Sequence, residues 1–220
     1  MSLYKTVRSE AEASQIIEKS KFIAHVKPVE SKEEADAFIR EIKSRYKDAT
    51  HNVPAMVVGD KFQIQWASDD GEPQGTSGAP IVQMLVKEEL TNLALVVTRY
   101  FGGIKLGTGG LVRAYTGSAK LGVEAAGICS VEEICRMTVE LDYSHLAKLQ
   151  SMASEKLSMD KNERASGAGK FVIADTRYTE KVTLEILNLP EDKNEVKSIF
   201  SNVTSGNAEF LTEETILEKI

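Results

Sequence analysis

The stretch LALVVTRYFGGIKLGTGGLVRAYTGSAKLGVEAA (residues 93–126) carries the main fold signal of this 220-residue chain. Its first part, residues 93–101, is a β-rich apolar run typical of a central strand. Residues 109–126 then form a predicted helix with small side chains along one side, namely Ala114, Ser118, Ala119 and Gly122. Because small residues let backbones approach closely, we expect this helix to pack directly on a sheet.

The segment that joins this strand to this helix has an unusually bare backbone. Residues 99–115 hold five glycines, two arginines and a lysine, but no acidic residue. Glycines between a strand and a helix N-terminus let backbone N–H groups converge on an anion. The segment lacks both the GK[ST] end of a Walker A loop and the downstream acid of a dinucleotide fingerprint. Two interpretations stay open: tight turns with close packing, or a site for an anion or phosphate backbone.

Charge and composition restrict the function classes. The net charge of -6 argues against a general polyanion-coating protein. Residues 91–122 nevertheless lack Asp and Glu and hold four cations, Arg99, Lys105, Arg113 and Lys120. Such an acid-free segment can attract an anion locally. The chain has no apolar run of bilayer length and no N-terminal signal-peptide core, so we expect a cytoplasmic protein that does not contact a membrane.

The distribution of glycine predicts two domains. Twelve of the fifteen glycines lie between Gly59 and Gly127. We therefore predict an N-terminal α+β domain over residues 1–132 and a second domain over residues 133–220. In the first domain, Ser31 and Glu34 form a capping box that opens a helix. Its other expected elements are strands at 22–29, 53–59, 61–68 and 93–101, and helices at 31–46, 79–89 and 109–126.

The second domain has the predicted order strand, helix, strand, strand, helix, strand. The expected segments are 134–144, 145–157, 170–179, 180–189, 191–203 and 207–216. This βαββαβ order fits a ferredoxin-like sandwich, a fold that hosts many functions. The two cysteines of the chain, Cys129 and Cys135, are too few for a disulfide framework.

A second polar segment, SDDGEPQGTSGAP (residues 68–80), brings three carboxylates within four positions: Asp69, Asp70 and Glu72. They could form a turn, bind a hard cation or contact a partner. Alternatively, the pair Asp69 and Asp70 could form salt bridges with the basic residues of the glycine-rich segment. In the same segment, Ser77 either caps the helix that begins near residue 79 or acts as a nucleophile. The second option needs His51 as its base.

These two segments resemble the signature of the IMPACT family. The residues that carry the resemblance are DDGEPQGTSGAPI (69–81) followed by VVTRYFGGIKLGTGGLVRAY (96–115). Their form and order resemble the bacterial YigZ-type, two-domain members, and the resemblance is strong over residues 1 to about 130. It implies a first domain like domain 2 of ribosomal protein S5, and a second domain like the ferredoxin-like domains of elongation factor G.

The resemblance also implies a setting in translation. Both related folds belong to translation machinery, and eukaryotic IMPACT restrains a starvation-responsive initiation kinase by competing for the activator of that kinase. This partner does not carry over to a bacterium. The chain also departs from the bacterial pattern, which often has HNC and then an aromatic residue. Here Val53 and Met56 stand in HNVPAM, which argues against thiol chemistry at that position.

The sequence thus predicts a non-catalytic regulator that binds RNA, the ribosome or a translation-related protein, with no cofactor and no bound metal. Two alternatives remain: a hydrolase or phosphate-handling enzyme using the three carboxylates with His51, and a protein-interaction adaptor. Tyr100, Phe101 or Tyr115 could stack on bases, although Tyr115 lies at core spacing. The predicted binding surface comprises His51, Asp69, Asp70, Glu72, Arg99, Tyr100, Gly102, Gly103, Lys105, Gly107, Thr108, Gly109, Gly110, Arg113 and Lys120.

Overall fold

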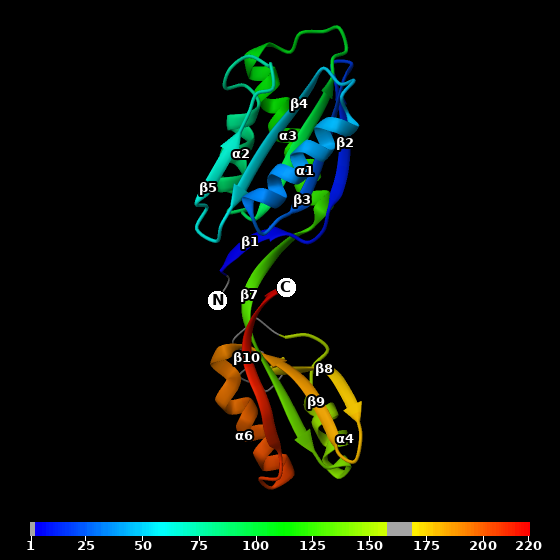
Figure 1. The fold of residues 1–220 in the computed structure, drawn as a ribbon, viewed down its shortest axis with the longest axis vertical. Helices are drawn as coiled ribbons and strands as arrows, with labels where there is room; N and C mark the ends of the chain where they lie inside the picture. Colours follow the sequence, from blue (N-terminus) through cyan, green and yellow to red (C-terminus); the bar gives the residue numbers. More distant parts are fainter. Residues whose placement is uncertain (1–2, 158–168) are drawn as a thin grey trace. The chain divides into compact units, whose positions relative to one another are not determined.

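The computed structural model describes residues 3–157 and 169–220, and within them the chain is an α+β protein with two antiparallel sheets and five α-helices (Figure 1). Two compact units divide the described chain. The first holds the residues up to Val131 together with Lys219–Ile220, and the second holds Glu132–Glu218. Strand β7 (Ile128–Leu141) begins in the first unit and ends in the second.

The first unit is built on a sheet with the strand order β2-β3-β6-β4-β5. One helix covers one face of this sheet and two helices cover the other (Figure 1). In chain order the elements are β1 (Tyr4–Val7), β2 (Ala11–Ile17), β3 (Ser20–Pro28), α1 (Lys32–Arg45), β4 (His51–Val58), β5 (Ile64–Ala67), α2 (Gly78–Lys87), β6 (Leu93–Tyr100) and α3 (Gly107–Ala126).

Strand β6 explains this three-layer arrangement. Its residues are buried from Leu93 to Arg99, as the prediction of a central strand requires. Alternate side chains enter different cores: Leu95 and Val97 join the core under α2 and α3, whereas Val96 joins the core under α1. Because helices cover both faces, the strand is apolar at successive positions rather than alternately polar.

The small face of α3 packs on the sheet as predicted. A Cβ atom added at Gly122 would lie 2.8 Å from both Ala24 Cβ and Val26 Cγ2 of β3. Ala114 and Ala119 on the same side of the helix are also buried. The lack of a side chain at Gly122 therefore sets how closely this helix approaches the sheet.

The N-terminal segment of the chain follows the prediction less closely. Ser31 caps α1 and accepts a hydrogen bond from the Glu34 N–H at 3.2 Å, as expected from the capping box. The Glu34 carboxylate, however, accepts from the backbone N–H of Glu30 instead of Ser31. The sequence does not predict strands β1 and β2, because their mixed polar residues do not form an apolar run.

The second sheet has the order β1-β7-β9-β8, with β10 also paired to β7, and β1 pairs with the part of β7 that lies in the first unit. The second unit places α4 (Tyr143–Met152) and α6 (Lys193–Thr204) against the strands β10-β7-β9-β8. The other strands are β8 (Phe171–Tyr178), β9 (Val182–Asn188) and β10 (Glu209–Lys219), and a short 3-10 helix, η1 (Pro190–Asp192), precedes α6. The core includes Met137, Leu149, Leu184 and Phe200. Among the described residues, no helix is long and apolar enough to cross a membrane.

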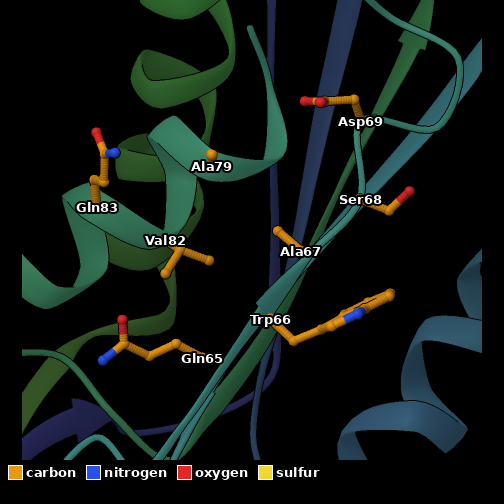
Figure 2. Close-up of a pocket in the computed structure, with 8 residues that line it drawn as sticks. All are labelled: Gln65, Trp66, Ala67, Ser68, Asp69, Ala79, Val82 and Gln83. Atoms are coloured by element: carbon orange, nitrogen blue, oxygen red, sulfur yellow. The ribbon is translucent and has the colours of Figure 1, made fainter. Parts of the chain in front are cut away.

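Strand β5 lies at the end of the first sheet, beside α2. Figure 2 shows Gln65 of β5 and Val82 of α2 on the two sides of the space between these elements, with Trp66 directed away from α2. The chain leaves β5 through Ser68 and Asp69 and enters the polar segment that precedes α2.

Candidate functional site

The glycine-rich segment forms a strand, a loop and a helix start, as predicted. β6 ends at Tyr100 and α3 begins at Gly107. Gly103 and Gly107 have φ values of +85° and +70°, in the left-handed region that favours glycine. No acidic residue occupies the first turn of α3, and its N-cap residue, Leu106, makes no side-chain cap hydrogen bond within the described chain. Among the described residues, the N-terminal end of this helix therefore lacks a side-chain cap, which leaves backbone N–H groups available to an anion.

A surface cavity of about 410 Å³ lies beside this helix start. Eight residues line it: Ile17, Glu18, Ile104, Lys105, Leu106, Gly110, Arg113 and Ala114. The cations Lys105 and Arg113 are both exposed. Neither side chain forms a hydrogen bond or an ion pair with any residue that the structure describes. We call Lys105, Arg113 and the turn of residues 107–110 the basic rim.

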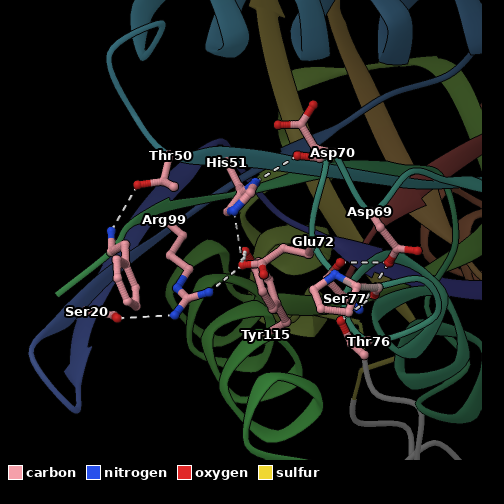
Figure 3. Close-up of polar contacts among 12 residues, drawn as sticks. Ser20, Thr50, His51, Asp69, Asp70, Glu72, Thr76, Ser77, Arg99 and Tyr115 are labelled. Carbon is pink, nitrogen blue, oxygen red and sulfur yellow. Dashed lines mark hydrogen bonds and ion pairs between the residues drawn. The ribbon is translucent and has the colours of Figure 1, made fainter. Parts of the chain in front are cut away.

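The other cation of the segment, Arg99, lies inside the protein. Its residue is 4% exposed, so the prediction that it belongs to a binding surface is wrong. The guanidinium donates to Glu72 Oε1 at 2.6 Å and to Ser20 Oγ at 3.3 Å (Figure 3). It also lies over the rings of Phe22 and Phe101, 5.3 Å and 5.4 Å from their centroids. These contacts give Arg99 a structural role.

Glu72 is the centre of a buried polar cluster that comprises Glu72, Arg99, Tyr115 and His51. Tyr115 donates its hydroxyl hydrogen to Glu72 Oε1 at 2.7 Å, and His51 Nε2 lies 3.8 Å from the same oxygen. Burial, together with this hydrogen bond to Glu72, raises the pKa of Tyr115 far above its usual range. Tyr115 is fully buried and forms an edge-to-face contact with Phe22, so it cannot stack on a base.

His51 connects this cluster to the turn that carries the carboxylates. Its Nδ1 lies 2.8 Å from the carbonyl oxygen of Asp70. Since a carbonyl oxygen can only accept, Nδ1 carries the hydrogen. Within the turn, the Glu72 N–H donates to the Asp69 carbonyl at 3.0 Å, and Asp70 and Gly71 have φ values of +49° and +88°. Positive φ at both central positions is the signature of a type I′ turn.

The Asp69 carboxylate caps the N-terminus of α2. It accepts hydrogen bonds from Ser77 Oγ at 2.7 Å and from the backbone N–H groups of Gly75, Ser77 and Gly78 at 2.7–3.1 Å. Burial raises the pKa of the Asp69 carboxyl, but these hydrogen bonds outweigh it and hold the pKa below its usual value. Ser77 stands at the predicted N-cap position, yet its hydroxyl makes no cap bond to the α2 backbone. Asp69 provides that cap instead.

Asp70 joins the turn to two other elements. One carboxylate oxygen accepts from Lys43 Nζ of α1 at 2.5 Å, and the other accepts from the backbone N–H of Asn52 in β4 at 2.6 Å. Of the predicted functions of the carboxylates, turn formation is confirmed, whereas the predicted salt bridges of Asp69 and Asp70 with the glycine-rich segment are wrong, since Asp69 caps α2 and Asp70 pairs with Lys43. The basic partner in the glycine-rich segment, however, is Arg99, and the carboxylate that binds it belongs to Glu72.

The contacts at Ser77 do not support a catalytic triad. Ser77 is fully buried, and its hydroxyl hydrogen goes to Asp69. The His51 nitrogens face Asp70 and Glu72 instead (Figure 3). The nucleophile interpretation of Ser77 is therefore wrong.

In the part of the chain that the structure describes, no group of three His, Cys, Asp or Glu residues is arranged to hold a metal ion.

The remaining predicted residues have varied surroundings. Tyr100 donates its hydroxyl hydrogen to the exposed Asp48, and Lys120 pairs with Glu88 at 2.8 Å. Gly102 passes so close to β3 that an added Cβ would lie 2.1 Å from the Lys19 carbonyl. Val53 and Met56, which replace the thiol and the aromatic residue of the bacterial pattern, are fully buried in the two cores of the first unit, as a packing role requires.

Sequence reasoning missed two polar residues of this region. Ser20 accepts hydrogen bonds from Arg99 and from the Gly102 N–H, and Lys43 pairs with Asp70. Both lie far from their partners in the sequence, and neither belongs to a local motif. Only the pairing of β3 with β6 brings Ser20 to Arg99, and only the packing of α1 on the sheet brings Lys43 to Asp70.

Comparisons with known proteins identify relatives along the whole chain. Residues 18–123 match the family model described as the Impact N-terminal domain. The chain is 37% identical over 217 residues to a Bacillus subtilis protein named IMPACT family member YvyE, covering 98% of this chain and 94% of that protein. It is also 34% identical over 141 residues to the Escherichia coli IMPACT family member YigZ, covering 63% of this chain and 69% of that protein.

A solved structure shares the fold. The crystal structure of a hypothetical protein matches with a TM-score of 0.56 and 27% sequence identity, over 96% of this chain and 97% of that one. The likeness therefore extends over both units of the chain.

Proposed function

The chain belongs to the IMPACT family, and on that premise we propose that it is a cytoplasmic, translation-associated regulator that binds RNA, free or on the ribosome, through the basic rim. The observation that carries this proposal is a pair of cations, Lys105 and Arg113, which have no ion-pair partner among the described residues. They lie beside a cavity at the N-terminus of α3, where those residues provide no side-chain cap. Exposed cations without an acidic partner are available to neutralise phosphates.

The expected mechanism is contact with the phosphate backbone. Lys105 and Arg113 supply positive charge, and the exposed turn at the start of α3 supplies backbone N–H groups. Such contacts position a nucleic acid but carry little sequence information, so we expect weak sequence preference. Phe101, which is 46% exposed, and Ile104 in the same loop offer apolar surface for a base.

Arg99 and Glu72 are not part of this surface, since both are buried. Lys120 is exposed, but its charge is already paired with Glu88. The RNA-binding surface that we propose is therefore smaller than the one predicted from the sequence. It consists of the basic rim and the other residues of the loop 101–106, which contains Lys105.

The second unit has a less suitable surface for RNA. On the sheet face opposite its helices, Arg136 pairs with both Glu185 and Glu214, and Lys181 pairs with Glu140. Three carboxylates against two cations make this face unfavourable for phosphates. We propose that RNA contacts the first unit.

We further propose the finer fold assignments implied by the family resemblance. For the second unit, the element order β7-α4-β8-β9-α6-β10 and the strand order β10-β7-β9-β8 support a ferredoxin-like fold, with the boundary near residue 132. For the first unit, the proposal of a fold like domain 2 of ribosomal protein S5 rests on the resemblance of the two signature segments.

The experiment that tests the function compares binding of a labelled single-stranded RNA, and co-sedimentation with purified ribosomes, for three proteins. These are the wild type, the double variant Lys105→Ala/Arg113→Ala and the control Lys120→Ala. The control removes a cation from the same helix whose charge Glu88 already neutralises.

We expect the double variant to lose RNA and ribosome binding and the control to keep both. Equal loss in the control would indicate a general effect of net charge rather than a site. Undiminished binding by the double variant would contradict the proposal. Ribosome binding that persists after nuclease treatment would instead indicate a protein partner on the ribosome.

A further inference from the structure

Strand β5 offers an open edge of the first sheet. In the strand order β2-β3-β6-β4-β5, β5 is terminal and pairs only with β4 among the described strands. Its residues, Ile64–Ala67, carry no charge and include no proline. Proteins usually protect an open edge with charges, prolines or bulges, because unpaired backbone groups accept a further strand. β5 has none of these three features, and its short length of four residues is its one protection against edge pairing.

The pairing with β4 shows which backbone groups face outward. The Ser68 N–H donates to the Pro54 carbonyl, which places a hydrogen-bonded pair at these two residues. The register then gives Met56 and Trp66 as the next such pair. Since hydrogen-bonded positions alternate along an antiparallel ladder, Gln65 and Ala67 direct their N–H and C=O groups away from β4.

A groove of about 380 Å³ lies between this edge and α2. Gln65, Ala67 and Ser68 line one side, and Ala79, Val82 and Gln83 line the other (Figure 2). An extended segment that paired with the edge of β5 would direct alternate side chains into this groove, because side chains alternate along a strand. An edge strand beside a helix is the arrangement by which several domains bind peptides through strand addition.

We propose that β5 and α2 form a docking site for an extended, uncharged peptide segment of a partner protein, which pairs with the backbone of Gln65 and Ala67. This site uses a different surface from the basic rim and does not depend on the proposed RNA binding.

The lining of the groove determines the chemistry of this occupant. Its polar groups are neutral amides and a hydroxyl, and its only charged residue is Asp69, whose carboxylate oxygens accept hydrogen bonds from Gly75, Ser77 and Gly78. A groove without a cation does not favour RNA. The exposed backbone groups are complementary to another backbone, and Ala79 and Val82 are complementary to small apolar side chains.

The protein contains its own reporter for this site. Trp66 is the only tryptophan of the chain, lies within β5 and is 45% exposed. An added strand would place a residue diagonal to Trp66 and reduce its exposure to water. Binding of a peptide without tryptophan should therefore shift the fluorescence emission of the protein.

The experiment selects short random peptides displayed on phage against the immobilised full chain. The most enriched peptide without tryptophan is then synthesised, and its affinity is measured by Trp66 fluorescence. Two variants complete the design. Gln65→Pro removes the outward N–H at a position where an edge strand tolerates proline, and Gln65→Ala removes only the side chain. Circular dichroism and thermal unfolding establish that both variants fold.

We expect Gln65→Pro to weaken peptide binding by about tenfold or more, the effect of losing a backbone hydrogen bond and gaining a steric clash. Gln65→Ala should bind nearly as well as the wild type. Failure to enrich any peptide, or equal binding by Gln65→Pro, would overturn the proposal. So would a wild-type dimer that becomes monomeric in Gln65→Pro, since the occupant would then be a second copy of this chain.

Discussion

The Glu72 carboxylate and the Arg99 guanidinium form a buried ion pair, with Oε1 and an Nη atom 2.6 Å apart. The two residues lie 27 positions apart in the sequence. Their contact joins the turn that follows β5 to the end of β6. Because Tyr115 donates to the same carboxylate, α3 is joined at this point as well. The Glu72 carboxylate therefore connects three segments of the first unit: the turn after β5, the end of β6 and α3.

Removing one member of this pair should destabilise the protein strongly. In Glu72→Gln the guanidinium of Arg99 stays buried without a counter-charge, which typically costs about 3–5 kcal/mol. Urea unfolding, followed by circular dichroism, measures this loss. Lys120→Ala breaks the exposed pair with Glu88 and should change stability by less than about 1 kcal/mol. A similarly small effect of Glu72→Gln would contradict the structural role of the cluster.

The capping carboxylate of Asp69 should make stability depend on pH. Its pKa in the folded protein lies below the usual value, so the unfolded state binds the proton more tightly. The stabilisation is complete above the unfolded pKa of about 3.9 and is lost as pH falls through the folded pKa. We therefore expect the stability difference between wild type and Asp69→Asn to be largest near neutral pH and to shrink below about pH 4.

This difference is measured by urea unfolding of both proteins across the pH range, so that effects of the other carboxyl groups cancel. A difference that stayed constant down to about pH 3 would show that the charge of Asp69 does not contribute to the cap.

Two glycines of α3 provide a matched test of the helix packing. Gly122→Ala places a methyl group 2.8 Å from Ala24 and Val26, so we expect destabilisation by about 1–3 kcal/mol through overpacking. At Gly117 the nearest atom to an added Cβ is Gln15 Nε2 at 3.6 Å. Gly117→Ala should therefore stabilise the protein by up to about 1 kcal/mol through helix propensity. Thermal unfolding of the two variants should shift in opposite directions; equal shifts would contradict the packing.

The regular elements could be predicted because their signals are local. The apolar run of β6, the cap of α1 at Ser31 and the small face of α3 at Gly122 each follow from a few neighbouring residues. β2 could not be predicted in this way. It is an edge strand with one face partly covered by α3, so polar and apolar residues mix along it.

The candidate site could be predicted only in part. The exposed glycine turn at the start of α3, together with Lys105 and Arg113, follows from the residue pattern. The burial of Arg99 does not, because its partners Glu72 and Ser20 come from distant segments. Similarly, Ser77 fits a local cap pattern, yet a carboxylate eight residues earlier takes that role.

The measurement that tests the account most directly is the salt dependence of RNA binding. The logarithm of the affinity for a single-stranded RNA is plotted against the logarithm of salt concentration for the wild type and for Lys105→Ala/Arg113→Ala. Arg99 is left unchanged, since its loss would disturb the core. With two phosphate contacts removed, we predict that the slope becomes shallower by about 1.4 while the control Lys120→Ala keeps the wild-type slope. An unchanged slope in the double variant would contradict the proposal that the basic rim binds phosphates.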